Sequence, residues 1–507
     1  MRALAALALA VLVLPAFAGC LTDSATAPQV PSPALLPATV QCPVAELCNL
    51  IATAEPDRQS NELSVAVNPL DPKNIIATGK DYKPSEAGDC TWAGIYTTKD
   101  GGLTWKQQNV PGSPWKRLQD PTTPITPFSK YWCATDPVVV FGPDGTAYWT
   151  VMPYQCDAVS GSKTGRGILP QGGFNDWAFT CSSMFVLVST DGGETWPIEK
   201  VREVATGPQL VHDKQWIAVS PDGNTVVLCW DFAGGASTTP DNPVANPAAA
   251  VVCTHSKDKG DTWTQFADTK VGGLFPWIEF GPDGRLWMVT TNGFESGDFQ
   301  VSSTTDLVNW EPPVKVGTFV NGEGRNEYGW PTLKGSSFRV VPVASLAVDR
   351  STGPYSGRIY VTYFDHAAGN GDTLLVWSDD GKTWSAPVRV NDDGDSPHDQ
   401  FMPVVSVGPD GTVDVSWQDR RDDPGNHLFH TYYAYSVDGG VTFSPNLRVT
   451  DVMSDEQYSH HQNGMIFLGD YRDSDSVAGA ATFIWVDTRN QKADAVVATV
   501  ARPGVAG

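Results

Sequence analysis

Histidine, aspartate and arginine residues gather in short polar segments that directly precede or follow apolar, strand-like runs. The segments that precede a run contain His212, Asp213, His398, Asp399, His460 and His461. The segments that follow a run contain Asp365, His366, Asp419, Arg420, Arg421, Asp487 and Arg489. Imidazole changes its charge near neutral pH, carboxylates exchange protons, and the arginine fork can bind a carboxylate through two hydrogen bonds. Together these residue types predict proton transfer on a polar ligand, or its recognition.

A structural explanation of the same residues stays open. Asp231, Asp365, Asp419 and Asp487 follow strand-like runs at equivalent positions, so charge-assisted bonds from them could simply join one repeated unit to the next. Arg420, Arg421 and the pair His460-His461 are not repeated, and they are the stronger candidates for ligand binding.

An eight-residue pattern, Ser/Thr-x-Asp-x-Gly-x-Thr-Trp, recurs along the chain and indicates which elements position the polar segments. The copies, complete or altered, are Thr98–Trp105, Ser189–Trp196, Ser256–Trp263, Thr304–Trp310, Ser378–Trp384 and Ser436–Phe443. In each copy the Asp can accept backbone N–H bonds, the Gly permits positive φ, and the aromatic residue can cover an apolar layer. We interpret the pattern as a tight turn between two strands, because an active site would need only one copy.

The repeated octet is identified as the Asp-box, and its repetition resembles the sialidase-type β-propellers. The resemblance implies an all-β fold with a single β-propeller, in which the Asp-boxes lie on peripheral turns between the third and fourth strands of the blades. Seven first strands can be traced in the sequence, which favours seven blades; six, the usual number in catalytic sialidases, is the alternative. The last unit, Met465–Val500, lacks an Asp-box, and we expect residues near Cys48–Pro56 to supply the strand that closes the ring.

The resemblance also implies where a ligand would bind and which residues would act on it. Loops that lead into first strands and out of second strands would meet around the axis, on the face away from the Asp-boxes. Sialidases hold a substrate carboxylate with three Arg, and they use an Asp as acid/base and a Tyr as nucleophile. Their Phe-Arg-Ile-Pro motif is missing upstream of Thr98, and the nearest string is Phe338-Arg339-Val340-Val341-Pro342. A sialidase-like assignment therefore makes Arg339, Arg420, Arg489, Asp213 and Tyr471 catalytic.

Three functions remain after this comparison of motifs. The first is recognition of extracellular glycans or glycoproteins, with sialidase-like hydrolysis as the activity. The second is a non-catalytic surface module for binding or assembly, which the missing Phe-Arg-Ile-Pro motif favours. The third is a polysaccharide lyase, whose acid/base chemistry the His-rich loops would suit.

Charge and motif content limit the partners. The chain has 57 acidic against 34 Lys and Arg residues, a net charge of −23, so a nucleic-acid partner is not expected. Oxygen-rich loops with calcium-binding spacing are absent, and we predict neither a metal nor another cofactor. We expect a monomer.

The N-terminus predicts export. Arg2 and the apolar run Ala3–Leu14 read as a signal peptide over residues 1–20, and the sequence before Cys20 resembles a bacterial lipobox, which would make Cys20 the lipid-bearing residue. Residues 21–48 read as a Pro- and Ala-rich tether and residues 49–507 as the propeller. The protein would then lie at the cell surface and contact the membrane only through its lipid.

The other eight cysteines of an exported chain favour disulfides over metal ligation. One pairing among many is Cys42–Cys48, Cys90–Cys133, Cys156–Cys181 and Cys229–Cys253.

Overall fold

A computed structural model describes residues 41–44, 47–53, 55–83, 90–155, 181–208, 211–233, 250–327, 329–462 and 465–502. Residues 1–40 lie outside the described residues, and with them the predicted signal peptide, Cys20 and most of the tether. Within the described ranges, no helix combines the length and the apolar character that a membrane crossing requires.

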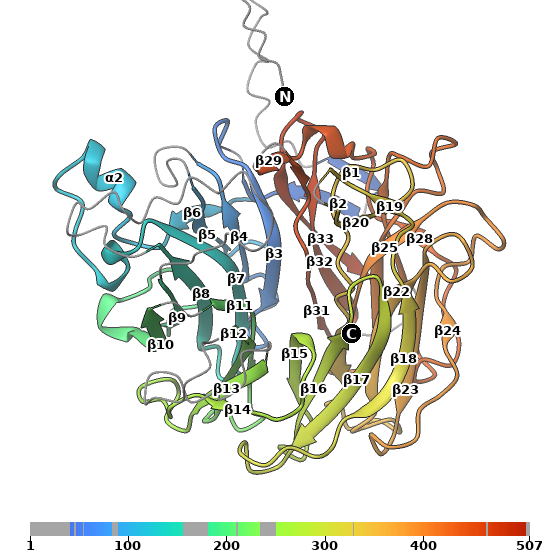
Figure 1. Ribbon diagram of the computed structural model, residues 1–507, viewed down its shortest axis with the longest axis horizontal. Helices are drawn as coiled ribbons and strands as arrows, with labels where there is room; N and C mark the ends of the chain where they lie inside the picture. The colour runs from blue at the N-terminus through green and yellow to red at the C-terminus, as the bar shows by residue number, and fades with distance from the viewer. Residues whose placement is uncertain are drawn as a thin grey trace, which may run out of the picture. The chain divides into compact units, whose positions relative to one another are not determined.

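Six four-stranded antiparallel sheets follow one another along the chain, each built from consecutive strands in sequence order. The first blade consists of β3 (Ser60–Val67), β4 (Ile75–Asp81), β5 (Trp92–Thr98) and β6 (Lys106–Asn109). The second consists of β7 (Cys133–Phe141), β8 (Ala147–Tyr154), β9 (Cys181–Ser189) and β10 (Val201–Pro208). The third consists of β11 (Val211–Val219), β12 (Val226–Ala233), β13 (Ala250–Ser256) and β14 (Ala267–Asp268). The fourth blade consists of β15 (Leu274–Phe280), β16 (Leu286–Asn292), β17 (Ser296–Thr304) and β18 (Val314–Val320). The fifth consists of β21 (Ser345–Val348), β22 (Ile359–Asp365), β23 (Asp372–Ser378) and β24 (Val388–Arg389). The sixth consists of β25 (Gln400–Val407), β26 (Val413–Asp419), β27 (His430–Ser436) and β28 (Leu447–Arg448). The first strands β3, β7, β11 and β15 lie toward the middle of Figure 1, and β6, β10 and β24 lie farther out.

The seventh blade joins the two ends of the described chain. It contains β31 (Ser474–Val477), β32 (Ala480–Asp487) and β33 (Asp494–Ala501), and β2 (Leu47–Ile51) pairs with β33 so that Leu50 faces Val497. β1 (Gln41–Val44) adds a fifth strand at its edge. The structure confirms the predicted all-β fold and the seven blades. The closing strand comes from the predicted region, although β1 and β2 begin before residue 49.

The Asp-box octets form the turns between third and fourth strands of six blades, as their resemblance to propeller turns implied. In the second blade Asp191 accepts hydrogen bonds from the Thr195 backbone N–H at 3.0 Å and hydroxyl at 2.6 Å. Gly193 has a φ of 87°, and a Cβ there would collide with Ile76 of the preceding blade. Thr97 of that blade donates a hydrogen bond to the Gly193 carbonyl, so the turn also joins neighbouring blades.

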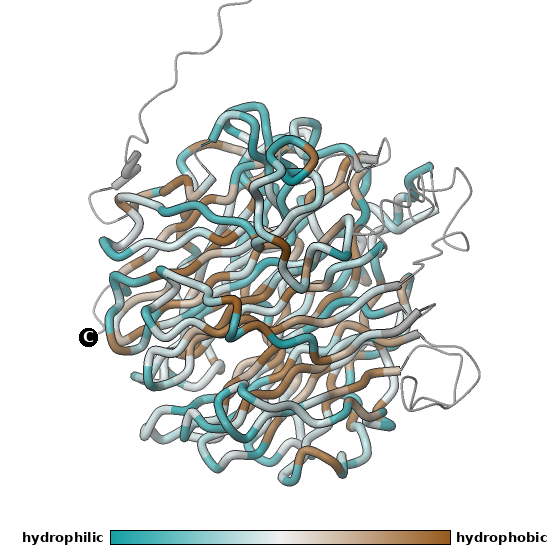
Figure 2. Tube along the Cα trace, turned by 90° about the vertical axis from the view of Figure 1, so that its left-hand side faces the viewer, coloured by the Kyte–Doolittle hydropathy of each residue, from teal (hydrophilic) through white to brown (hydrophobic). Residues whose placement is uncertain are grey.

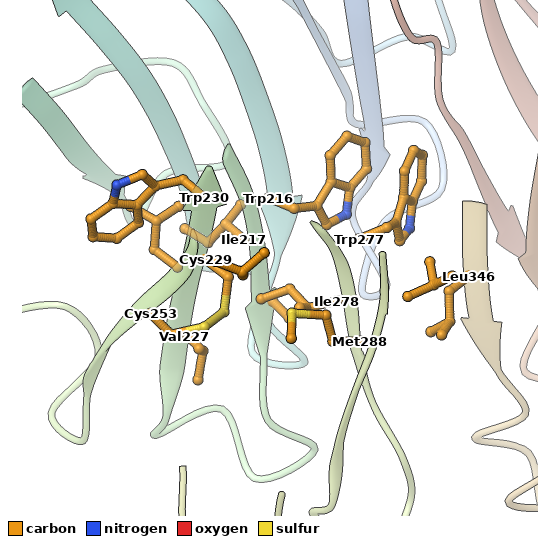
Figure 3. Packing of buried hydrophobic residues seen from close by; sticks show 14 of the residues in the cluster. Trp216, Ile217, Val227, Cys229, Trp230, Cys253, Trp277, Ile278, Met288 and Leu346 are labelled. Atoms are coloured by element: carbon orange, nitrogen blue, oxygen red, sulfur yellow. A yellow bond between two sulfur atoms is a disulfide. The ribbon is translucent and has the colours of Figure 1, made fainter. Parts of the chain in front are cut away.

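Apolar side chains fill the spaces between blades, and hydrophilic residues gather in the loops at the strand ends (Figure 2). Figure 3 shows Trp216 of β11 stacked on Trp277 of β15, with ring centroids 3.5 Å apart. The Cys229–Cys253 disulfide joins β12 to β13, and Cys90–Cys133 joins the first blade to the second. These two predicted pairs are confirmed. Cys48 is also disulfide-bonded, whereas the side chains of Cys42, Cys156 and Cys181 lie outside the described ones.

Two segments outside the blades form what we call the cap, residues 321–344 and 451–473. They carry the hairpins β19 (Gly324–Arg325)–β20 (Pro331–Thr332) and β29 (His460–Gln462)–β30 (Met465–Phe467), and the 3₁₀ turn η5 (Glu456–Tyr458). The Ser337 N–H donates to Glu456 at 2.9 Å, which joins the two segments. β19, β20 and β29 lie at the upper end of Figure 1, and the turns after β13, β17 and β23 lie at the lower end. β30 therefore belongs to the cap, and only three strands of the last unit belong to its blade.

Besides η5 of the cap, the described helices are short and lie outside these sheets. They are α2 (Pro114–Gln119), η1 (Pro127–Lys130) and η4 (Ile198–Lys200).

Ring closure by β2 predicts a specific truncation phenotype. Deleting residues 1–53 removes the strand that covers the β33 edge, and an uncovered edge both loses its ladder bonds and exposes apolar surface. We expect the Tm, measured by circular dichroism, to fall by more than about 10 °C. A variant lacking only residues 1–40 keeps every described strand and is the control; equal Tm values for the two truncations would contradict closure by β2.

Candidate functional site

Five first strands contain a bulge whose central residue has a left-handed backbone although it is not glycine. The residues are Glu62, Asp136, Lys214, Phe275 and Met402, with φ values of 50 to 58°. At each of them the strand register shifts. Such backbone costs free energy for an L-residue, and it persists where the surrounding structure fixes it, often at functional sites.

Three of these bulges bring charged side chains from consecutive blades together. Lys214 Nζ lies 2.8 Å from a carboxylate oxygen of Glu62, 3.0 Å from one of Asp136 and 2.8 Å from one of Asp470. Arg339 Nε of the cap donates to Asp470 at 2.8 Å. We call Glu62, Asp136, Lys214, Arg339 and Asp470 the axial cluster, because it joins first strands from around the ring. Glu62 and Asp470 side chains are each 1% exposed, Lys214 9% and Arg339 15%.

The surroundings shift the pKa values of two carboxyl groups of the axial cluster in opposite directions. Burial, and then the neighbouring Asp136, raises the pKa of Glu62. Burial alone would also raise the pKa of Asp470, but Arg339 and Lys214 hold it below its ordinary value. Glu62 therefore keeps a proton to higher pH than Asp470. Unlike acidities of this kind allow one carboxyl to act as an acid while another stays charged.

Partly exposed side chains lie beside the axial cluster. Asp213 is one, and the Lys214 N–H donates to its carboxylate at 3.0 Å. Phe294 and Trp330, which are also partly exposed, form with the buried Phe275 a second group, which we call the aromatic wall; successive ring centroids lie 5.6 and 5.8 Å apart. The Arg339 guanidinium lies 5.2 Å from the centre of the Trp330 ring, so the wall and the axial cluster are in contact.

Three of the five predicted catalytic residues lie around Lys214. Asp213 is adjacent in sequence, Arg339 shares Asp470 with it, and Lys214 Nζ lies 5.7 Å from the centre of the Tyr471 ring. The Tyr471 hydroxyl donates to the Pro137 carbonyl at 3.3 Å, and burial raises the pKa of this phenol well above 10. That geometry opposes formation of a tyrosinate nucleophile.

The other two predicted catalytic residues are held by different carboxylates. Arg420 is fully buried and donates to Glu456 at 3.0 Å and to Ser336 at 2.8 Å. Arg489 donates to Asp487 at 2.8 Å and lies 2.9 Å from Asp451. Because Arg339 is engaged with Asp470, the structure does not direct the three guanidinium groups at one position.

Several of the other predicted ligand-binding residues make structural bonds. Trp417 and Trp485 donate their indole N–H to Asp419 and Asp487, which also accept from Arg421 and Arg489 respectively. Asp365 accepts from the Val320 N–H of the preceding blade at 2.8 Å. These contacts correspond to the structural explanation of the repeated aspartates.

The predicted histidines lie in three different environments. His212 is buried, accepts the Trp230 indole N–H at 2.8 Å, and burial lowers its pKa to about 3. His366 is buried 3.4 Å from Asp399, and His398 contacts Ser396 at 2.8 Å. His460 stacks on Tyr82 with ring centroids 3.5 Å apart, and burial lowers its pKa to about 4. His461 is exposed. The buried His212 and the partly exposed His460 both have lowered pKa values, so they are neutral and poor proton donors at neutral pH.

Glu62, Asp136, Lys214 and Asp470 were not among the predicted site residues. The first three share a signal that the sequence does contain: each stands six positions before the first residue of the following hairpin turn, Asn68, Gly142 or Ser220. Asp470 belongs to the cap, which has no repeat, and no comparable signal marks it. Across the described residues, no group of three or more His, Cys, Asp or Glu side chains is arranged to hold a metal ion.

A groove and a cavity among the described residues offer other places where a ligand could bind. A groove of about 450 Å³ lies on the Asp-box side between the fourth and fifth blades, beside Arg285, Trp287 and Gly381. A cavity of about 110 Å³ lies among the first strands and is lined by Glu279, Asp473 and Asp475. The groove is the larger of the two. It lacks, however, a pair of carboxyl groups with oppositely shifted pKa values such as Glu62 and Asp470, so we favour the axial cluster as the candidate site.

The axial cluster predicts an unequal response to two Lys→Met substitutions. Lys214→Met leaves three buried carboxylates without their shared cation, and we expect a loss of about 3–5 kcal/mol in unfolding free energy. Lys259→Met removes an exposed ion pair with Asp144 and should cost less than about 1 kcal/mol. Urea unfolding measures both, and similar losses would show that the axial cluster does not hold the blades together.

Comparison with known proteins finds only distant structural likenesses. No family model and no curated protein matches the sequence. Among solved structures, a Hadza microbial sialidase is 11% identical with a TM-score of 0.43, covering 85% of this chain and 77% of its own. The Penicillium chrysogenum alpha-L-arabinanase complexed with arabinobiose is 10% identical with a TM-score of 0.43 over 91% of this chain and 100% of its own. The GH93 alpha-L-arabinofuranosidase of Fusarium graminearum is 14% identical with a TM-score of 0.42 over 74% and 92%. Likeness at this level carries no argument about the reaction. Strand pairing shows a seven-bladed β-propeller, with Asp-box octets at the turns between third and fourth strands of six blades.

Proposed function

We propose that the protein recognises and hydrolyses glycans outside the cell, at the mouth of the propeller axis. The observation that carries the proposal is the juxtaposition of charged and aromatic groups there. Asp213, Lys214 and Arg339 form one side, and the aromatic wall, in contact with Arg339, forms the other. Sugars offer both hydroxyl groups for charged side chains and apolar C–H faces for aromatic rings.

The partly exposed residues divide the work of such a site. Trp330 and Phe294 stack on a sugar ring, and an Arg339 N–H that does not bind Asp470 donates to an oxygen substituent. Asp213 is the partly exposed carboxyl beside them and is the proposed acid/base for the glycosidic oxygen. Glu62 and Asp470 both pair with Lys214 and fix its position. Because its pKa is raised, Glu62 is the carboxyl proposed to hold a proton in this buried group.

The proposed substrate class is broader than sialic acid. All three arginines are bound to carboxylates: Arg420 to Glu456, Arg489 to Asp487 and Arg339 to Asp470. Arg339 is the one proposed to reach a ligand as well, because it is 15% exposed and contacts the aromatic wall. This supports a glycan bound by a single arginine and the aromatic wall. Sialidase activity remains one activity within the proposal.

A non-catalytic module for surface binding or assembly is the second candidate. The axial cluster is almost fully buried and its charges are mutually satisfied, which is what a structural lock between blades requires. Such a module would bind a glycan at the aromatic wall without cleaving it.

The first test measures turnover of a panel of fluorogenic glycosides that includes sialosides, arabinosides and uronides. We expect Asp213→Asn and Arg339→Ala each to lower kcat/KM at least 100-fold, because acid/base catalysis and charged positioning each supply about that much. Arg285→Ala is the matched control, since Arg285 also lies beside a tryptophan but at the Asp-box side.

Two outcomes separate the candidates. Glycan-array binding that Trp330→Ala abolishes, with no turnover of any glycoside, would favour the non-catalytic module. Turnover that survives both Asp213→Asn and Arg339→Ala would reject the axial mouth as the catalytic site.

We also propose that the protein is exported and anchored through Cys20. The disulfides Cys90–Cys133 and Cys229–Cys253 support an oxidising compartment, and the lipobox-like sequence supports the anchor. Cys20→Ser should move the protein from the membrane to the soluble fraction in a bacterial expression host, measured by fractionation and immunoblotting. Unchanged membrane association would contradict lipid attachment at Cys20.

A further inference from the structure

Arg472, just before β31, is a buried cation with an incomplete set of partners. Its relative exposure is 3%. Nε donates to the Ile484 carbonyl at 3.3 Å and Nη2 to the Ser416 hydroxyl at 2.6 Å, while Nη1 has no hydrogen-bond partner. Buried N–H groups without an acceptor cost free energy, and a buried charge without a counter-charge costs more.

Other buried arginines show what Arg472 lacks. Arg420 is bound to Glu456 at 3.0 Å, and Arg502 is bound to Asp414 at 2.5 Å. No carboxylate oxygen of the described residues forms an ion pair with Arg472. The adjacent Asp473 instead accepts from the Ser64 hydroxyl and the Ser474 N–H, both at 2.8 Å.

The pKa shifts of Arg472 and Asp473 agree with a guanidinium that lacks a full counter-charge. Burial lowers the pKa of Arg472 to about 9. Burial also raises the pKa of Asp473 to about 7, so near neutral pH this carboxyl is only partly charged. Asp473 therefore supplies at most a fraction of the missing negative charge.

Two small cavities are lined by Arg472. They have volumes of about 20 and 10 Å³, and both are also lined by Met402 and Tyr471. A volume of about 10–15 Å³ suffices for one particle the size of a water molecule. The larger cavity is otherwise lined by Gln418 and by apolar side chains, namely Leu63, Phe401, Phe429, Leu468 and Val486.

We propose that the larger cavity binds a single monatomic anion, chloride under physiological conditions, which serves as the counter-charge of Arg472. Arg472 Nη1 and the Gln418 amide provide the polar side of the site. A water molecule would satisfy the free N–H but could not neutralise the guanidinium. The site lies where segments of the first, sixth and seventh blades meet, so its occupancy should stabilise the ring. This inference does not depend on the proposed function.

Thermal unfolding of the whole protein tests the proposal in two sodium salts of equal ionic strength, chloride and gluconate. Binding to the folded state alone raises Tm with ligand concentration. We expect a Tm about 2 °C higher in chloride, saturating as chloride is titrated against gluconate. Bromide should act like chloride. Arg472→Met should lose the difference between the salts, whereas Arg350→Met, which removes a half-exposed arginine paired with Glu279, should keep it.

A second measurement uses only the wild-type protein, in case Arg472→Met does not fold. Crystals grown or soaked in sodium bromide should show one anomalous peak within hydrogen-bond distance of Arg472 Nη1. Equal Tm values in chloride and gluconate, or ordinary water density with no anomalous peak in the cavity, would overturn the proposal.

Discussion

The burial of one ammonium group, Lys214 Nζ, among three carboxylates is the interaction on which the axial end of the propeller depends. The carboxylates come from the first blade, the second blade and the cap, so the first strands cannot move apart without exposing unpaired charge. Left-handed backbone at Glu62, Asp136 and Lys214 aims the side chains inward at this point. The fourth and sixth blades repeat the same bulge with Phe275 and Met402, so one side of the mouth is charged and the other is apolar.

The cap completes this arrangement. Arg339 places its guanidinium between Asp470 and the Trp330 ring, which couples the axial cluster to the aromatic wall. His460 and Phe467 cover the same region, through a stack on Tyr82 and a contact of 4.8 Å between Lys80 Nζ and the Phe467 ring. Since propeller blades are repeated and the cap is not, we expect the cap to contribute most of the specificity of the proposed site.

The fold followed from the sequence to the extent that it repeats. Each Asp-box marks a turn between third and fourth strands, and counting first strands gave seven blades and an incomplete last one. Even the closing strand was expected near Cys48, because a ring needs a partner for β33. The site followed less well. Arg420 and Arg489 occur beside aspartates, but the sequence alone cannot distinguish an arginine that faces a ligand from one bound to Glu456 or Asp487. His212 sits in a polar segment, yet its ring lies in the apolar core against Trp230. The axial cluster could be recognised only from the structure, because Lys214 and Asp470 are distant in sequence.

The most direct test of this account is a crystal structure with a bound oligosaccharide from the glycan array. The account predicts a sugar ring against Trp330 and Phe294, with an oxygen substituent on Arg339 and a glycosidic oxygen within reach of Asp213. A sugar seated instead in the groove beside Trp287, on the Asp-box side, with the axial cluster untouched, would contradict it.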